Sequence, residues 1–134
     1  MKERTDALSG ASIFAGLSRR SVERIARSAK EFEAPAGQVL IEGRTPGSGM
    51  FVVIDGVAEV DLRSKGTREV ARGECFGELS LLIPGGLRVA RVRAKTPMRC
   101  IAIGRDDFRK ILVSEPKVAL GILETLAVRL AAEV

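Results

Sequence analysis

One arginine in the middle of the chain is predicted to face inward. Over residues 90–94, alanine and valine alternate with arginine, which predicts a strand with its apolar side chains on the buried face. Arg88 stands two residues before Ala90, so the same alternation predicts that its side chain points to the buried face. A guanidinium stays charged in proteins and is costly to bury without an anion. The pattern therefore predicts an anion beside Arg88, supplied either by the protein or by a ligand.

The residues just upstream are suited to holding phosphate. Gly77 has no side chain to keep a ligand from the backbone, and the amides of Glu78, Leu79 and Ser80 would open a short helix with free N–H groups. Such N-termini bind phosphate. Glu78 would be misplaced beside a phosphate unless it accepts hydrogen bonds from neutral hydroxyls, such as those of a ribose. Phosphate plus sugar indicates a nucleotide.

Residues 76–82 (FGELSLL), followed by 88–94 (RVARVRA), resemble the phosphate-binding cassette of cyclic nucleotide-binding domains. That family includes bacterial catabolite activator proteins, protein kinase A regulatory subunits and cyclic-nucleotide-gated channels. The resemblance implies that Glu78 holds the ribose 2'-hydroxyl, Arg88 the charged oxygens of the cyclic phosphate, and the amides of residues 77–80 the rest. The chain departs from the usual pattern at Gly86-Leu87 and at Arg91.

The resemblance also indicates which base the bound nucleotide would carry. Members that favour cGMP often have threonine after the arginine, whereas this chain has Val89, which cannot bond the guanine amino group. We therefore expect cAMP as the ligand, with cGMP as the alternative. Apolar walls for the base would include Val70 and Phe76. Arg129, followed by Leu130, resembles an Arg-Leu pair that some members have in their C-terminal helix. Its side chain would either reach the ligand or be exposed on the surface.

Composition fits one globular domain without evident catalytic chemistry. The 134 residues are 46% hydrophobic and 29% charged, and the chain has no histidine, the commonest general base. No Ser-His-Asp, metal or P-loop constellation is present, so we expect neither an enzyme nor a metal or cofactor site. Cys75 and Cys100 are expected to be buried or half-buried thiols, with a disulfide or redox role as the lesser alternative.

The basic residues do not predict a nucleic-acid site. The net charge is +5, but lysine and arginine are interleaved with acids along the chain, and tyrosine and tryptophan are absent. We interpret the excess as a solvated surface. No apolar run is long enough to span a membrane and no signal-peptide pattern begins the chain, so the expected location is the cytoplasm.

Short β-segments set off by glycine turns occupy the middle of the chain and predict a mainly β fold with flanking helices, an antiparallel jelly-roll-like β-roll. The expected strands are 38–41, 50–54, 57–62, 67–71, the cassette strand and 98–103, the last ended by Gly104, and the inward residues of 57–62 are Ala58, Val60 and Leu62. Asp55-Gly56 predicts a type I' hairpin. One domain, 1–134, would comprise an N-terminal helical segment (1–33), the roll (34–104, with cassette 76–90) and C-terminal helices (105–134).

The flanking segments have helical patterns. After a weakly patterned leader anchored by Leu8, Ile13, Phe14 and Leu17, Ser18 is a good N-cap for a helix through about Lys30. Its predicted apolar stripe is Val22, Ile25, Ala26 and Ala29.

A short helix opened by Asp106 and containing Phe108, Ile111 and Leu112 is followed by a final helix, with Ser114 as a candidate N-cap and Pro116 in its first turn. The expected apolar face of the final helix is Val118, Ile122, Leu123, Leu126, Ala127 and Leu130. It would pack on the roll or form a homodimer.

The resemblance implies a cyclic-nucleotide sensor in which ligand occupancy moves the C-terminal helix as a lid. An N-terminal Phe-x-x-Leu, here at residues 14–17, also shifts with occupancy in the family. Because the chain ends at Val134, about where base-contacting residues are expected, the lid is expected to be short, incomplete or supplied by a partner subunit. The alternatives are a degenerate fold in which Glu78 pairs with Arg88 and the surface binds proteins, or the regulatory fragment of a transcription factor.

Overall fold

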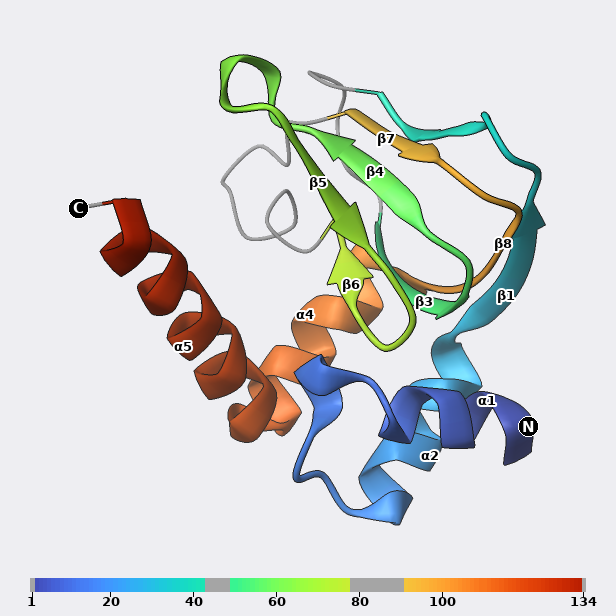
Figure 1. Ribbon diagram of the computed structural model, residues 1–134. Helices are drawn as coiled ribbons and strands as arrows, with labels where there is room; N and C mark the ends of the chain where they lie inside the picture. Colours follow the sequence, from blue (N-terminus) through green and yellow to red (C-terminus); the bar gives the residue numbers. More distant parts are fainter. Residues whose placement is uncertain (1, 43–48, 78–90, 134) are drawn as a thin grey trace.

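Two antiparallel sheets form a β-roll that rests on a layer of helices (Figure 1). The computed structural model describes residues 2–42, 49–77 and 91–133. In Figure 1 the N-terminal helices and α4 lie below the roll, and α5 extends along its left side. The predicted β-roll with flanking helices is therefore confirmed. The short helix expected in the cassette lies outside the described residues.

The helical elements and strands follow one another along the chain with short connections. They are α1 (Lys2–Ser9), η1 (Ser12–Phe14), α2 (Arg19–Ser28), β1 (Lys30–Ala34), β2 (Val39–Ile41), β3 (Gly49–Asp55), β4 (Ala58–Asp61), η2 (Arg63–Lys65), β5 (Thr67–Val70), β6 (Cys75–Phe76), β7 (Arg91–Ala94), β8 (Met98–Gly104), α4 (Arg105–Ser114) and α5 (Pro116–Glu133).

Each sheet has four strands. The first has the order β1-β8-β3-β6 and the second β2-β7-β4-β5, and every pairing is antiparallel. Strands distant in sequence are neighbours in both sheets: β3 lies between β8 and β6, and β7 lies between β2 and β4. This interleaving brings the end of β6 and the start of β7, which flank the cassette, into one roll.

The two central strands of the first sheet, β3 and β8, are buried on both faces. Alternate residues of β3 and β8 point into the roll, where Val53 and Cys100 join a core with Val60 and Val92 of the second sheet. The intervening residues, among them Met50, Val52, Ile101 and Ile103, pack against the helices in a second core. This double burial explains why residues 50–54 form a wholly apolar strand rather than an alternating one.

The N-terminus of α2 agrees with the sequence. Ser18 is the N-cap and its side chain accepts a hydrogen bond from the Ser21 amide at 3.2 Å. The predicted apolar stripe and anchors are buried or partly buried in the core beneath the first sheet: Leu8, Ile13, Phe14, Leu17, Val22, Ile25, Ala26 and Ala29.

Two elements near the N-terminus were not predicted. The leader contains α1, whose charged sequence has little helical pattern but which packs on α2. Arg4 Nη1 donates hydrogen bonds to the carbonyls of Ala26 and Ala29 at 3.1 and 2.8 Å, satisfying acceptors at the C-terminal end of α2. Residues 30–33, expected in the helical segment, belong to strand β1; their mostly charged sequence gave no strand signal, and pairing with β8 decides their structure.

The predicted hairpin at Asp55-Gly56 is wrong. β3 and β4 do not pair with each other but lie in different sheets, so this turn carries the chain from one sheet to the other. Gly56 does adopt a positive φ of 91°. A hairpin and a corner between sheets can both require that backbone conformation, and the dipeptide alone does not distinguish them. The hairpin in this region joins β4 and β5, through η2 and Gly66.

Two further corrections concern the ends of elements. Ala58 and Val60 are buried as predicted, but β4 ends at Asp61 and Leu62 is 36% exposed. Ser114 does not cap α5: it is the last residue of α4, and its hydroxyl donates to the Lys110 carbonyl at 2.9 Å. Gly104 closes β8 and occupies the N-cap position of α4, while Pro116 begins α5 as expected.

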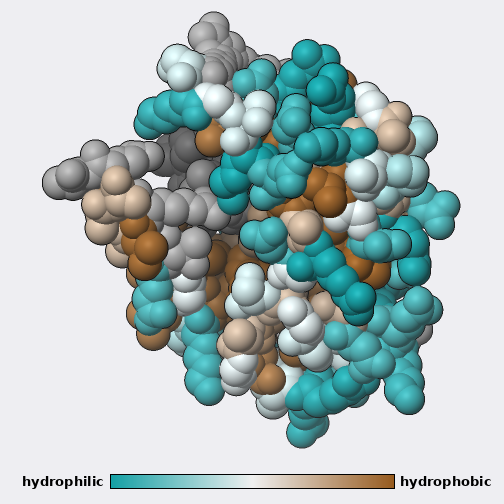
Figure 2. Space-filling view, viewed as in Figure 1, coloured by the Kyte–Doolittle hydropathy of each residue, from teal (hydrophilic) through white to brown (hydrophobic). Residues whose placement is uncertain are grey.

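The predicted apolar face of α5 is buried at some positions and exposed at others. Val118 and Ile122 are buried and Leu126 is partly buried against the helical core. Leu123 and Leu130, predicted on the same face, are 63% and 64% exposed. Ala127 is also exposed. Figure 2 shows hydrophobic residues at the surface along this helix, so only part of the predicted face is covered by the described residues.

No described helix combines the length and the apolar character that crossing a membrane requires.

We predict that alanine is tolerated much less at Gly56 than at Gly66. Both glycines have positive φ, near 90°, but a Cβ at Gly56 would lie 2.3 Å from the Pro97 carbonyl oxygen, whereas nothing lies within 4 Å at Gly66. Gly66→Ala should cost about 1 kcal/mol from backbone strain alone, and Gly56→Ala about 2 to 4 kcal/mol because the corner must also shift. Urea unfolding of both variants measures the difference, and equal losses would contradict the role of the corner.

We also predict that the Cys100 thiol is unreactive in the folded protein. Cys100 is fully buried, and this burial raises the pKa of its thiol from 9.0 to about 11. Because the thiolate is the nucleophile, labelling with N-ethylmaleimide should be at least about a hundredfold slower than in unfolded chain. The measurement uses Cys75→Ala, which leaves Cys100 as the remaining cysteine, with and without denaturant. Equal labelling rates would mean that this core opens readily.

Candidate functional site

The cassette begins where β6 ends. Phe76 and Cys75 pair with Phe51 and Val52 of β3, which fixes the direction in which the chain leaves the first sheet. Gly77 follows at once with a φ of 90°, a conformation that residues with a Cβ rarely adopt. The glycine that the sequence assigned to close backbone approach is thus also required by the turn itself.

A row of three aromatic rings leads across the first sheet to this turn. The rings of Phe32 and Phe51 meet edge to face with centroids 5.5 Å apart, and those of Phe51 and Phe76 stack at 5.1 Å. Phe76 is 2% exposed and Val70 is fully buried, and both belong to the core between the sheets. Phe76 directly precedes Gly77 in the chain, and contact of Phe76 and Val70 with a base stays a prediction.

The strand on the far side of the cassette has the predicted alternation. Val92 and Ala94 of β7 are 3% and 1% exposed and face the core between the sheets. Arg91 and Arg93 are on the outer face, with side chains 55% and 56% exposed. The period-two pattern used to assign the inward face is therefore confirmed for the described part of this strand, residues 91–94.

Most of the predicted ligand-binding residues belong to the cassette between β6 and β7. Glu78, Leu79, Ser80, Arg88 and Val89 lie outside the described residues. Arg129 belongs to the C-terminal half of α5, but its side chain also lies outside the described part of the chain. Of the predicted ligand-binding set, the structure thus places Gly77 at the end of β6, and Val70 and Phe76 in the core between the sheets.

Charges on the outer face of the second sheet are arranged in pairs. Arg93 lies 3.4 Å from Glu59 on β4, and Arg91 lies 3.3 Å from Glu42. Lys95 donates a hydrogen bond to Glu69, and this bond together with the charge of Glu69 raises the pKa of the lysine ammonium. Such pairing gives a mixed surface here rather than the continuous basic stripe expected of a nucleic-acid interface.

Within the described residues, no three histidine, cysteine, aspartate or glutamate side chains are grouped so that they could hold a metal ion.

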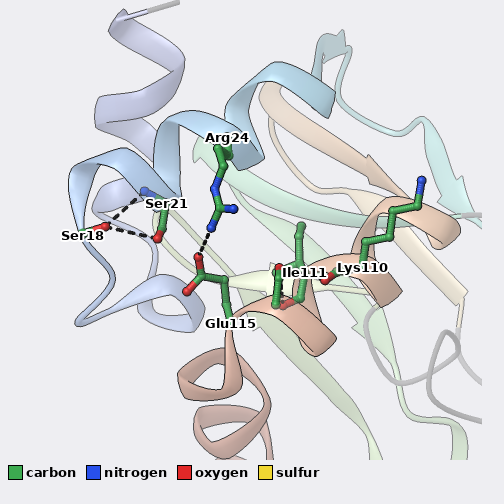
Figure 3. Close-up of polar contacts among 7 residues, drawn as sticks. Ser18, Ser21, Arg24, Lys110, Ile111 and Glu115 are labelled. Carbon is green, nitrogen blue, oxygen red and sulfur yellow. Dashed lines mark hydrogen bonds and ion pairs between the residues drawn. The ribbon is translucent and has the colours of Figure 1, made fainter.

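A second polar centre, which the sequence did not reveal, lies where α2 meets the junction of α4 and α5 (Figure 3). Arg24 Nη2 donates to Glu115 Oε1 at 2.7 Å, across 91 positions of sequence. Lys117 Nζ also lies 3.4 Å from the Gly16 carbonyl oxygen. Arg24 lies off the predicted apolar stripe of this helix, and no local pattern in the sequence links residues so distant in the chain.

Comparison with known proteins identifies the fold and the family. Residues 31–115 match the cyclic nucleotide-binding domain family, a match that covers more than half of the chain. The chain is 25% identical over 130 residues to the "CRP-like cAMP-activated global transcriptional regulator" of Mycobacterium tuberculosis, covering 93% of this chain and 58% of that protein. It is 34% identical over 91 residues to a cAMP-dependent protein kinase regulatory subunit of Emericella nidulans, covering 66% and 22% respectively.

Among solved structures, the catabolite activator protein of Thermus thermophilus superposes with a TM-score of 0.79 at 26% identity, over 92% of this chain and 60% of that one. The chain thus spans less than two thirds of the length of each of these three relatives. The shared roll and the match over 31–115 lead to one conclusion. The chain belongs to the cyclic nucleotide-binding domain family, as a non-catalytic regulatory domain.

Proposed function

We propose that this domain is a cAMP sensor whose ligand lies against the cassette, residues 76–90, and whose occupancy moves α5. The observation that carries the proposal is the family match over 31–115, which includes the whole cassette with its glycine, glutamate and arginine at family-like spacing. The positive φ of Gly77 supports it, because this conformation favours glycine, and a residue without a side chain lets a ligand come close to the chain. A sensor of this kind implies a cytoplasmic location.

In the proposed pocket, Arg88 would supply the positive charge that binds the cyclic phosphate. Counting the alternation confirmed at residues 91–94 back along the sequence predicts that the Arg88 side chain would face the interior. There a guanidinium needs an anion, and the cyclic phosphate would supply it. Glu78 would then accept from the ribose hydroxyl. If instead Glu78 and Arg88 pair with each other, the domain would be a degenerate member that acts through protein contacts.

We predict that Arg88→Ala lowers cAMP affinity by more than tenfold. Losing one member of a desolvated charge pair costs roughly 2 to 5 kcal/mol. Isothermal titration of the purified chain with cAMP and cGMP measures both affinity and preference, and cAMP should bind more tightly because Val89 lacks a hydroxyl.

Arg91→Ala is the matched control for this experiment. It removes the same charge three residues along the chain, from the exposed face of the strand, and should leave affinity within about twofold. Equal losses in the two variants would contradict the inward assignment of Arg88. No heat from a folded wild-type sample would favour the degenerate alternative.

We further propose that α5 forms a homodimer. Its exposed residues Leu120, Leu123, Ala127 and Leu130 recur at spacings of three, four and three, a heptad seam that lies beside the buried stripe of Val118 and Ile122. Three large apolar side chains on one exposed helix face favour burial against a second copy of the same helix.

The double variant Leu123→Glu/Leu130→Glu should convert a dimer into a monomer in sedimentation velocity, because two charges on each chain would enter the seam. Val128→Glu is the matched control: Val128 is 70% exposed but lies off the heptad seam, so this variant should remain dimeric. A wild-type protein with the mass of one chain would contradict the proposal.

A further inference from the structure

Glu115 is the joint between α4 and α5. It is the one residue between the two helices, and its backbone is non-helical, with φ −127° and ψ 80°. α5 is 18 residues long, so a small rotation at this residue displaces its far end by a large distance. Whatever restrains Glu115 therefore sets the direction of the whole helix.

The side chain of Glu115 is held by the N-terminal part of the chain. It is only 15% exposed and accepts the hydrogen bond from Arg24 at 2.7 Å, while Arg24 is 57% exposed (Figure 3). A carboxylate that has lost most of its water is costly to leave without a partner. The pair is thus more strongly coupled than two fully exposed charges would be.

The surroundings of the pair restrain the root of α5 but leave space beside the joint. Val118 and Ile122, one and two turns into α5, are buried in the same core as Phe14 of η1. In contrast, an open groove of about 210 Å³ separates α2 from α4 and is lined by Ser21, Ile25, Ser28, Asp107, Lys110, Ile111 and Ser114 together with the pair itself. Arg24 and Glu115 also line this groove, and the bond between them joins α2 to the residue that separates α4 from α5.

We infer that the Arg24–Glu115 ion pair is a latch that holds α5 against η1 and α4, and that α5 turns about Glu115 when the pair opens. This inference deepens the proposed function, because the same helix is the proposed lid over the cyclic nucleotide. Its effect on binding follows from linkage: a lid that must first break the latch binds ligand more weakly than one that is already free.

The primary test is hydrogen exchange of the α5 amides in the absence of ligand. Arg24→Ala and Glu115→Gln should each speed exchange in α5 by about two- to fivefold, the range for a partly exposed ion pair. Arg27→Ala is the matched control, because it removes the same charge from α2 but no bond to Glu115, and it should leave exchange unchanged. The charge swap Arg24→Glu/Glu115→Arg should restore slow exchange.

Two outcomes would overturn the latch: unchanged exchange in both single variants, or equal acceleration in Arg27→Ala. A swap that fails to fold leaves these two criteria in force. High salt provides an independent measurement, because it should speed exchange in the wild type and have little effect in Arg24→Ala.

Titration with cAMP then separates this inference from the proposed function. If the wild type binds, the single variants should bind about two- to fivefold more tightly. If no variant binds, the proposed function fails, and the exchange experiment still decides the latch.

Discussion

The structure depends on the burial of both faces of one sheet. β3 and β8 present one set of side chains to the second sheet and the other set to the helices, so the two cores share a wall. A shift of one residue in the register of these strands would exchange the two sets. The roll and the helical layer are therefore specified together, and the position of the helices is tied to the geometry of the strands that flank the cassette.

This shared wall also explains how a ligand site in the roll could influence a helix outside it. β6 leads into the cassette and pairs with β3, while β3 packs on the helical core that holds the first two turns of α5. A change in backbone position at Gly77 would therefore reach Val118 and Ile122 through β3 and the helical core, which are in direct contact. Packed cores transmit such shifts because they contain few voids to absorb them.

The C-terminal helix combines two kinds of restraint. Its first turns are fixed by apolar burial and by the ion pair at Glu115, whereas the exposed leucines farther along it meet no described partner. Because α5 is packed at its N-terminal end and exposes leucines along the rest of its length, its contacts can change without unfolding the helix.

The sequence by itself determined the elements whose signals are local. Alternation fixed the inward face of β7, Ser18 marked the start of α2, and the cassette residues indicated the family, since each depends on side chains close together in the chain. Tertiary structure decided the rest. The charged strand β1 exists because β8 pairs with it, Gly56 turns a corner between sheets rather than a hairpin, and Arg24 meets Glu115 across 91 positions. These features arise from contacts between distant segments, and such contacts leave no periodic pattern in the sequence.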